Sequence, residues 1–103
     1  MTAERDAYRA HLGKRLLQCG VPETLHEGLV EYVAARRPVG GFLAAVLAND
    51  LKDAVVRADV DNLPYLRGLL LFLLNYVTAR CWGSRDTVKA WLANPEPPDE
   101  VFE

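Results

Sequence analysis

A cluster of polar side chains in the middle of the chain has the residue types that could do chemistry. Asn49, Asp50 and Asp53 stand at positions i, i+1 and i+4, which brings them together if this stretch is helical. Neighbouring carboxylates can bind a metal ion or act as acid and base. A metal site between helices also takes acids or histidines from facing helices, and His11 and His26 have no ligand spacing with each other or with these acids. The sequence therefore predicts no metal and no cofactor here.

We favour a structural interpretation of the same cluster. Asp50 stands beside the apolar stripe of its segment, near Leu47 and Leu51, so we expect its carboxylate to be partly buried. A buried charge requires a partner, and either Arg57 or the turn at Asp59–Asn62 can supply one. The outward polar side of the segment then stays available to contact another molecule.

Three other patterns resemble parts of known sites and lack the rest of them. Asp59–Asp61 opens like a calcium loop, but Leu63 stands where that loop needs an oxygen ligand. Gly40–Gly41 precedes a predicted helix without a P-loop or dinucleotide fingerprint, and Ser84 is not in a G-x-S-x-G elbow. Caps and a tight turn explain these residues, so we expect no enzyme.

Trp82 is the aromatic residue with the best claim to an exposed position. It follows Arg80 and Cys81 in a predicted loop. Aromatic residues and arginines often anchor a partner surface, and packing into the core is the alternative. Cys19 and Cys81 form no CxxC motif, and the charged N-terminal stretch lacks the apolar core of a signal peptide. We therefore expect a cytoplasmic protein with two free, reduced thiols.

Glycines, prolines and capping residues divide the chain into five expected helices. The first runs from about Thr2 to Cys19 and stops at Gly20, which suits the end of a helix. The second begins at Pro22, because proline fits the first helical turn. It ends at Pro38, because the residue before a proline is pushed out of the helical region.

The third expected helix has the clearest pattern and runs from about Gly41 to Ala58. Its apolar stripe consists of Leu43, Leu47, Leu51, Ala54 and Ala58. The fifth begins after its cap Ser84 and ends at Asn94–Pro95.

The fourth segment, from Pro64 to about Val77, is apolar nearly all round. A helix of this kind is usually surrounded by others, so we place it at the centre. No segment alternates apolar and polar residues, so no strand is expected. The sequence predicts an all-α fold, a compact bundle of about five helices around a central apolar helix. Residues 1–93 would form this single domain, and residues 94–103 an acidic, proline-rich, flexible tail.

Composition narrows the function classes. The chain has 12 Lys and Arg against 14 Asp and Glu, a net charge of −2, and half of its residues are apolar. A nucleic-acid-binding protein usually carries a clustered basic face, which the doublets Lys14–Arg15 and Arg36–Arg37 do not form. The apolar stretch around Leu69–Leu74 is shorter than the about 20 residues of a membrane span. We therefore expect neither a membrane nor a nucleic acid as partner.

A longer pattern extends roughly from Val21 to Leu92. Its residues are Gly41-Phe42-Leu43, Ala45-Val46-Leu47, Asn49-Asp50-Leu51, Ala54, Arg57-Ala58-Asp59, Asn62, Asn75, Cys81-Trp82-Gly83-Ser84, Lys89 and Trp91. This pattern resembles one in small phage and prophage proteins, except that a proline is expected near Thr78. The resemblance implies an accessory protein of a bacteriophage or mobile element. Such proteins often bind and block a host protein, as anti-CRISPR proteins do, although a family likeness does not fix the function.

The leading hypothesis is a non-enzymatic, protein-binding accessory protein of phage or mobile-element origin that blocks a host protein, for example a CRISPR or other defence complex. The predicted contact residues are Asn49, Asp50, Asp53, Arg57 and Trp82. The alternatives are a small helical nucleic-acid-associated regulator and a small hydrolase or metal enzyme. The leucine excess between Pro64 and Val77 also allows a homodimer that shares part of that surface.

Overall fold

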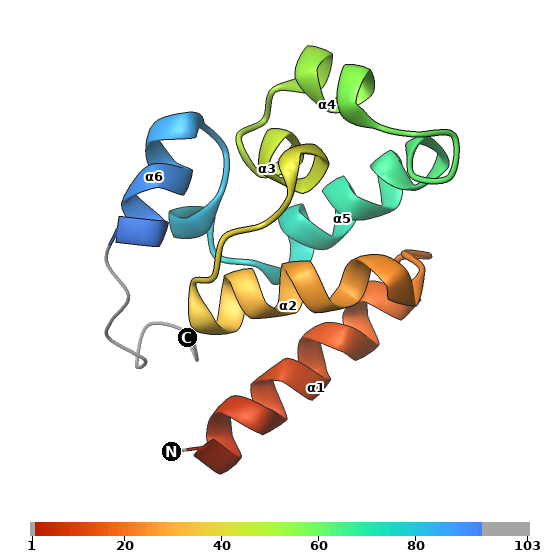
Figure 1. The fold of residues 1–103 in the computed structure, drawn as a ribbon. Coiled ribbons are helices and arrows are strands. Elements are labelled where there is room, and N and C mark those ends of the chain that lie inside the picture. Colours follow the sequence, from red (N-terminus) through yellow and green to blue (C-terminus); the bar gives the residue numbers. More distant parts are fainter. Residues whose placement is uncertain (1, 94–103) are drawn as a thin grey trace.

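The computed structural model describes residues 2–93, and these residues fold into helices and loops (Figure 1). This part of the chain contains no strand. Its elements are α1 (Thr2–Gln18), η1 (Glu23–Leu25), α2 (His26–Ala35), α3 (Gly41–Leu47), α4 (Leu51–Arg57), η2 (Leu63–Tyr65), α5 (Leu66–Tyr76), η3 (Ala79–Cys81) and α6 (Arg85–Ala93), where η marks a short 3₁₀ helix. The predicted all-α fold is confirmed, and residues 2–93 form six α-helices where about five were expected. The predicted tail at residues 94–103 lies outside the described residues.

Local capping signals set two helix ends where the sequence predicts them. Gly20 has a φ of 80°, and its N–H donates a hydrogen bond to the Leu17 carbonyl at 3.0 Å, which closes the end of α1. At the start of α6, the hydroxyl oxygen of Ser84 accepts a hydrogen bond from the Thr87 N–H at 3.1 Å. Each signal acts within one helical turn, so the sequence alone reveals it.

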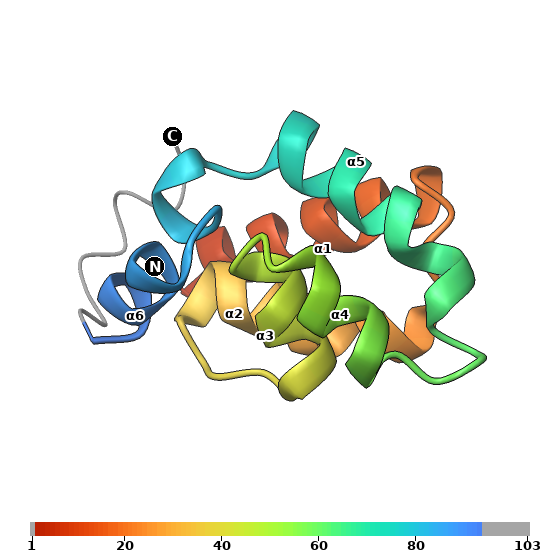
Figure 2. The same ribbon diagram turned by 90° about the horizontal axis from the view of Figure 1, so that it is seen from above.

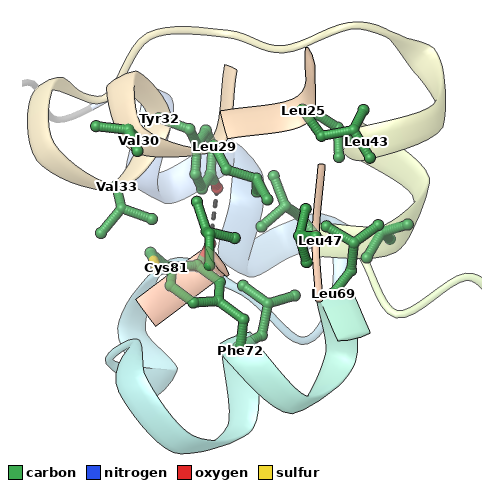
Figure 3. Close-up of a cluster of buried hydrophobic side chains, with 14 of the residues drawn as sticks. Leu25, Leu29, Val30, Tyr32, Val33, Leu43, Leu47, Leu69, Phe72 and Cys81 are labelled. Carbon is green, nitrogen blue, oxygen red and sulfur yellow. Dashed lines mark hydrogen bonds between the residues drawn. The ribbon is translucent and has the colours of Figure 1, made fainter. Parts of the chain in front are cut away.

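Helix α2 lies at the centre of the core, between α1 and α3 in Figure 1. Its buried residues are Leu29, Val30, Tyr32, Val33 and Ala34. Leu12 and Leu16 of α1 and Leu47 of α3 belong to the same buried cluster. In the close-up of Figure 3, side chains of α2 meet those of α3 and α5. The helices of residues 2–93 therefore share one core.

The apolar helix α5 is not enclosed on every side, which differs from the central position expected for it. It buries Leu69, Phe72 and Leu73 on one face, because α1 and α3 pack there. On its outer face, Leu74 keeps 68% of its surface exposed. The apolar sequence therefore supplies both a core face and a solvent-facing apolar surface. Within residues 2–93, no helix is long and apolar enough to cross a bilayer.

Residues 41–58 form two helices, α3 and α4, where the sequence predicts one. Asn49 between them takes a left-handed backbone conformation with a φ of 59°, which asparagine tolerates better than most residues. The Asp50 carboxylate then caps α4 by accepting the Asp53 N–H at 3.1 Å. A stop signal and a start signal are thus adjacent, and they override the helical spacing of the apolar residues.

The two short helices form a hairpin. The guanidinium of Arg57, at the end of α4, lies against Gly41, at the start of α3. In this arrangement Ala54 is buried, while Leu51 keeps 62% of its surface exposed. The predicted continuous stripe is therefore wrong at Leu51, because the reversal turns that side chain away from the core.

Candidate functional site

Two ion pairs connect the start of α4 to Arg85, the first residue of α6, and a third lies within α4. Nη2 of Arg85 lies 2.7 Å from Oδ2 of Asp50 and 3.2 Å from Oδ2 of Asp53. Oδ2 of Asp53 also accepts a hydrogen bond from Nε of Arg57 at 2.9 Å. We call Asp50, Asp53, Arg57 and Arg85 the ion-pair cluster.

The two oxygens of Asp50 serve different partners within the ion-pair cluster. Oδ1 accepts the Asp53 N–H, and Oδ2 accepts the Arg85 guanidinium. The backbone hydrogen bond from Asp53, followed by the contact with Arg85, holds the pKa of Asp50 below its ordinary value. Hydrogen bonds to Asp50 and then Asp53 raise the pKa of Arg85. Because Asp50 stays deprotonated, it is suited to accept hydrogen bonds and poorly suited to act as a general acid.

The ion-pair cluster joins segments that are distant in sequence. Arg85 stands 35 residues from Asp50 and 32 from Asp53. Close by in the chain, the Gly83 N–H donates a hydrogen bond to the Leu47 carbonyl at 2.7 Å. Together these contacts hold the α3–α4 hairpin against the start of α6, so the charged side chains have a fixed support.

The structure brings three of the five predicted contact residues together, namely Asp50, Asp53 and Arg57. Asn49 is exposed in the turn just before them. Trp82 is only half-buried in its loop and packs against the core, so its side chain is shared between the interior and the surface. The predicted residues thus fall into a charged group and a partly packed aromatic residue.

Arg85 is the member of the ion-pair cluster that the sequence does not predict. Asp50 pairs with Arg85 instead of the expected Arg57 or the turn at Asp59–Asn62. The Asp59 carboxylate serves that turn itself, accepting the N–H groups of Asp61 and Asn62 at 3.0 and 2.9 Å. No short-range spacing connects Arg85 to the aspartates, because only the reversal at Asn49 brings α4 beside α6.

An open depression adjoins the ion-pair cluster. Its lining residues are Asp50, Lys52, Asp53, Val56 and Arg85. Small-molecule sites usually enclose most of the ligand surface in an apolar pocket, whereas this depression is open and mixes both charges. It is therefore better suited to contact a complementary surface.

Ser84 and Cys81, outside the ion-pair cluster, are engaged in structural contacts. The hydroxyls of Ser84 and Thr87 lie 2.9 Å apart and share a hydrogen bond. Cys19 and Cys81 are both free, as predicted. Burial raises the pKa of Cys81 to about 12, so its sulfur stays a protonated thiol near neutral pH. Within residues 2–93, no three His, Cys, Asp or Glu residues gather in a group that could hold a metal ion.

Comparisons with protein-family models, with curated proteins and with solved structures found no match. The resemblance to small phage and prophage proteins therefore stays a prediction from the sequence.

Proposed function

We propose that this protein is a non-enzymatic binding protein that occupies a surface of another protein. In the setting that the sequence resemblance implies, it is an accessory protein of a phage or mobile element and blocks a host protein, such as a CRISPR or other defence complex. The observation that carries the proposal is the ion-pair cluster. Its four side chains are fixed by mutual contacts while 29% to 61% of their surface stays exposed.

Preorganised charges of this kind favour recognition. Side chains already held by partners lose little conformational entropy when another surface covers them. Charges at the edge of an interface raise the association rate and suppress wrong partners. Two carboxylates and two guanidinium groups balance within the ion-pair cluster, so it offers both hydrogen-bond acceptors and donors. A charge-balanced cluster is not the clustered basic face that a nucleic-acid backbone requires, and this supports a protein as the partner.

The test is capture of a partner from a bacterial lysate by the immobilised full chain, with identification of the retained protein by mass. Binding to that protein is then measured for the charge exchange Asp53→Arg with Arg57→Asp, which preserves the net charge. We expect affinity to fall by about tenfold or more, roughly 1.4 kcal/mol. Lys14→Glu, on the exposed side of α1, is the control and keeps the affinity.

Circular dichroism establishes that the exchanged chain keeps its helices. An unchanged affinity in a folded exchange variant means that the ion-pair cluster is not the contact surface. Retention of DNA or RNA in place of a protein, confirmed by a gel shift at low salt, overturns the proposed function itself.

A further inference from the structure

A small, mostly apolar groove lies between α4 and α5. The two helices are neighbours in the ribbon of Figure 2. Val46 and Ala54, both buried, form its floor, and Leu51 of α4 and Leu66 and Leu70 of α5 form its walls. Asn49 and Asp50, in the turn before α4, complete its lining. We call these seven residues the α4–α5 groove. It arises because α4 packs on α3, so that one side of α4 faces α5 across a gap in the packing.

The apolar surface continues from the α4–α5 groove onto exposed side chains. The exposed fraction of the residue surface is 62% for Leu51, 45% for Val55 and 68% for Leu74. Leu51 and Val55 stand four residues apart on α4, and Leu70 and Leu74 stand four apart on α5, so each wall carries an apolar strip along its helix. Contiguous exposed apolar surface is a mark of an interaction site.

Both outer edges of this surface carry a positive charge. Lys52 stands three residues before Val55 on α4, and Arg67 stands three residues before Leu70 and seven before Leu74 on α5. Both side chains are exposed. In the part of the chain that the structure describes, neither one forms an ion pair. Asp50, the acid in the groove lining, is already paired with Arg85, so its charge is compensated.

We infer that the α4–α5 groove is the docking site for an amphipathic helix of the partner protein, with an apolar stripe flanked by acidic side chains. This inference rests on the proposed function and names the element of the partner that is recognised. The apolar stripe fills the space between the two walls, as in other helix-in-groove complexes. Acidic residues on either side of the stripe meet Lys52 and Arg67.

The charges also select against a second copy of the chain as the occupant. In a symmetric pair of chains meeting at this face, each wall faces either the opposite or the equivalent wall of the other copy. Both edges are positive, so like charges meet in either arrangement, which is unfavourable across an interface. An acidic helix relieves this repulsion.

The test uses two synthetic amphipathic peptides of about 18 residues, roughly five helical turns. They share one leucine stripe, which glutamates flank in one peptide and lysines in the other. Amide chemical shifts of the isotope-labelled full chain report where each peptide binds. We expect the glutamate peptide to shift amides of α4 and α5 and to bind about tenfold more tightly than the lysine peptide.

Two double variants and one control variant make the result specific. Lys52→Glu with Arg67→Glu changes only exposed side chains and should reverse the preference between the peptides. Leu51→Asp with Leu74→Asp should abolish the shifts, whereas Leu17→Asp, at an exposed leucine of α1, should leave them in place. Equal binding of both peptides, shifts outside α4 and α5, or self-association through these amides without peptide each overturns the inference.

Binding of the groove variants to the captured host protein distinguishes failure of this inference from failure of the proposed function. If Leu51→Asp with Leu74→Asp loses the host protein while Leu17→Asp keeps it, the groove is the docking site. If both variants keep it, the groove inference fails and the proposed function stands. If the chain captures no protein at all, the proposed function fails, and the peptide result then decides only whether the groove recognises acidic helices.

Discussion

The hydroxyl of Tyr32 donates a hydrogen bond to the backbone carbonyl of Cys81 across 2.7 Å, which joins α2 to η3 in the interior (Figure 3). The backbone carbonyl of Tyr32 in turn accepts a hydrogen bond from Nε1 of Trp91 at 2.9 Å. All three residues are buried. Tyr32 therefore connects the central helix to both segments that follow α5, and the position of α6 depends on it.

Tyr32→Phe should destabilise the fold while keeping its shape. The substitution leaves the Cys81 carbonyl without its partner in the interior, and an unsatisfied buried group costs about 1–3 kcal/mol. Chemical denaturation measures the loss as a lower urea midpoint with an unchanged slope. Tyr65→Phe, at a half-buried tyrosine of η2, is the control and should stay close to the wild type. Equal midpoints for Tyr32→Phe and the wild type would contradict this role of the hydroxyl.

Gly68→Ala and Gly13→Ala should change stability in opposite directions. A Cβ atom at Gly68 would meet the backbone oxygen of Cys19 at 2.5 Å, so α1 and α5 would have to separate. Overpacking of this kind costs about 1–3 kcal/mol. A Cβ atom at Gly13 meets nothing within 4 Å, and alanine in a helix interior stabilises by about 0.5–1 kcal/mol relative to glycine. Thermal unfolding compares the stability of each variant with that of the wild type. A Gly68→Ala variant more stable than the wild type would refute the close approach of α5 to the Cys19 backbone.

Local signals made part of this fold predictable. Gly20 and Ser84 mark helix ends because each acts on its own helical turn. The sequence does not predict the break at Asn49, because the apolar spacing continues across it while the turn depends on one left-handed residue and one cap. It does not predict the role of Arg85 either, because the partners of Arg85 are 32 and 35 residues away. The site was thus predictable where its residues share a helix, and not where the hairpin brings them to α6.

Substitutions at Asn49 should show that the turn depends on a left-handed residue. Asn49→Gly keeps or slightly raises stability, because glycine adopts a positive φ without steric cost. Asn49→Ala should lose about 1–2 kcal/mol, the usual cost of the left-handed region for other residues. Urea denaturation of the two variants gives the difference. Equal stabilities would mean that α3 and α4 can join into one continuous helix.

Because of the ion pair between Asp50 and Arg85, the stability of the fold should decrease at acidic pH. The pKa of Asp50 is lower in the folded chain than in the unfolded chain. Its contribution is therefore present above the unfolded pKa and disappears as the pH falls through the folded value. Asp50→Asn keeps a capping residue and removes the charge. Melting temperatures from about pH 7 to about pH 2 should differ between wild type and variant at neutral pH and converge in acid. Arg85→Gln should shrink the same difference, and a gap that persists in acid would contradict the assignment.

Cys81 should resist alkylation in the folded chain. It is fully buried, and burial raises its pKa to about 12, so at about pH 8 almost none of it is the reactive thiolate. Iodoacetamide should therefore modify Cys19, which is half-buried, and reach Cys81 only after unfolding in urea. The raised pKa also predicts that stability falls as the pH rises above 9, since the unfolded thiol ionises first. Mass spectrometry of the native protein distinguishes one modified cysteine from two. Modification of Cys81 at the rate of Cys19 would place η3 outside the core and remove the support that Tyr32 gives to α6.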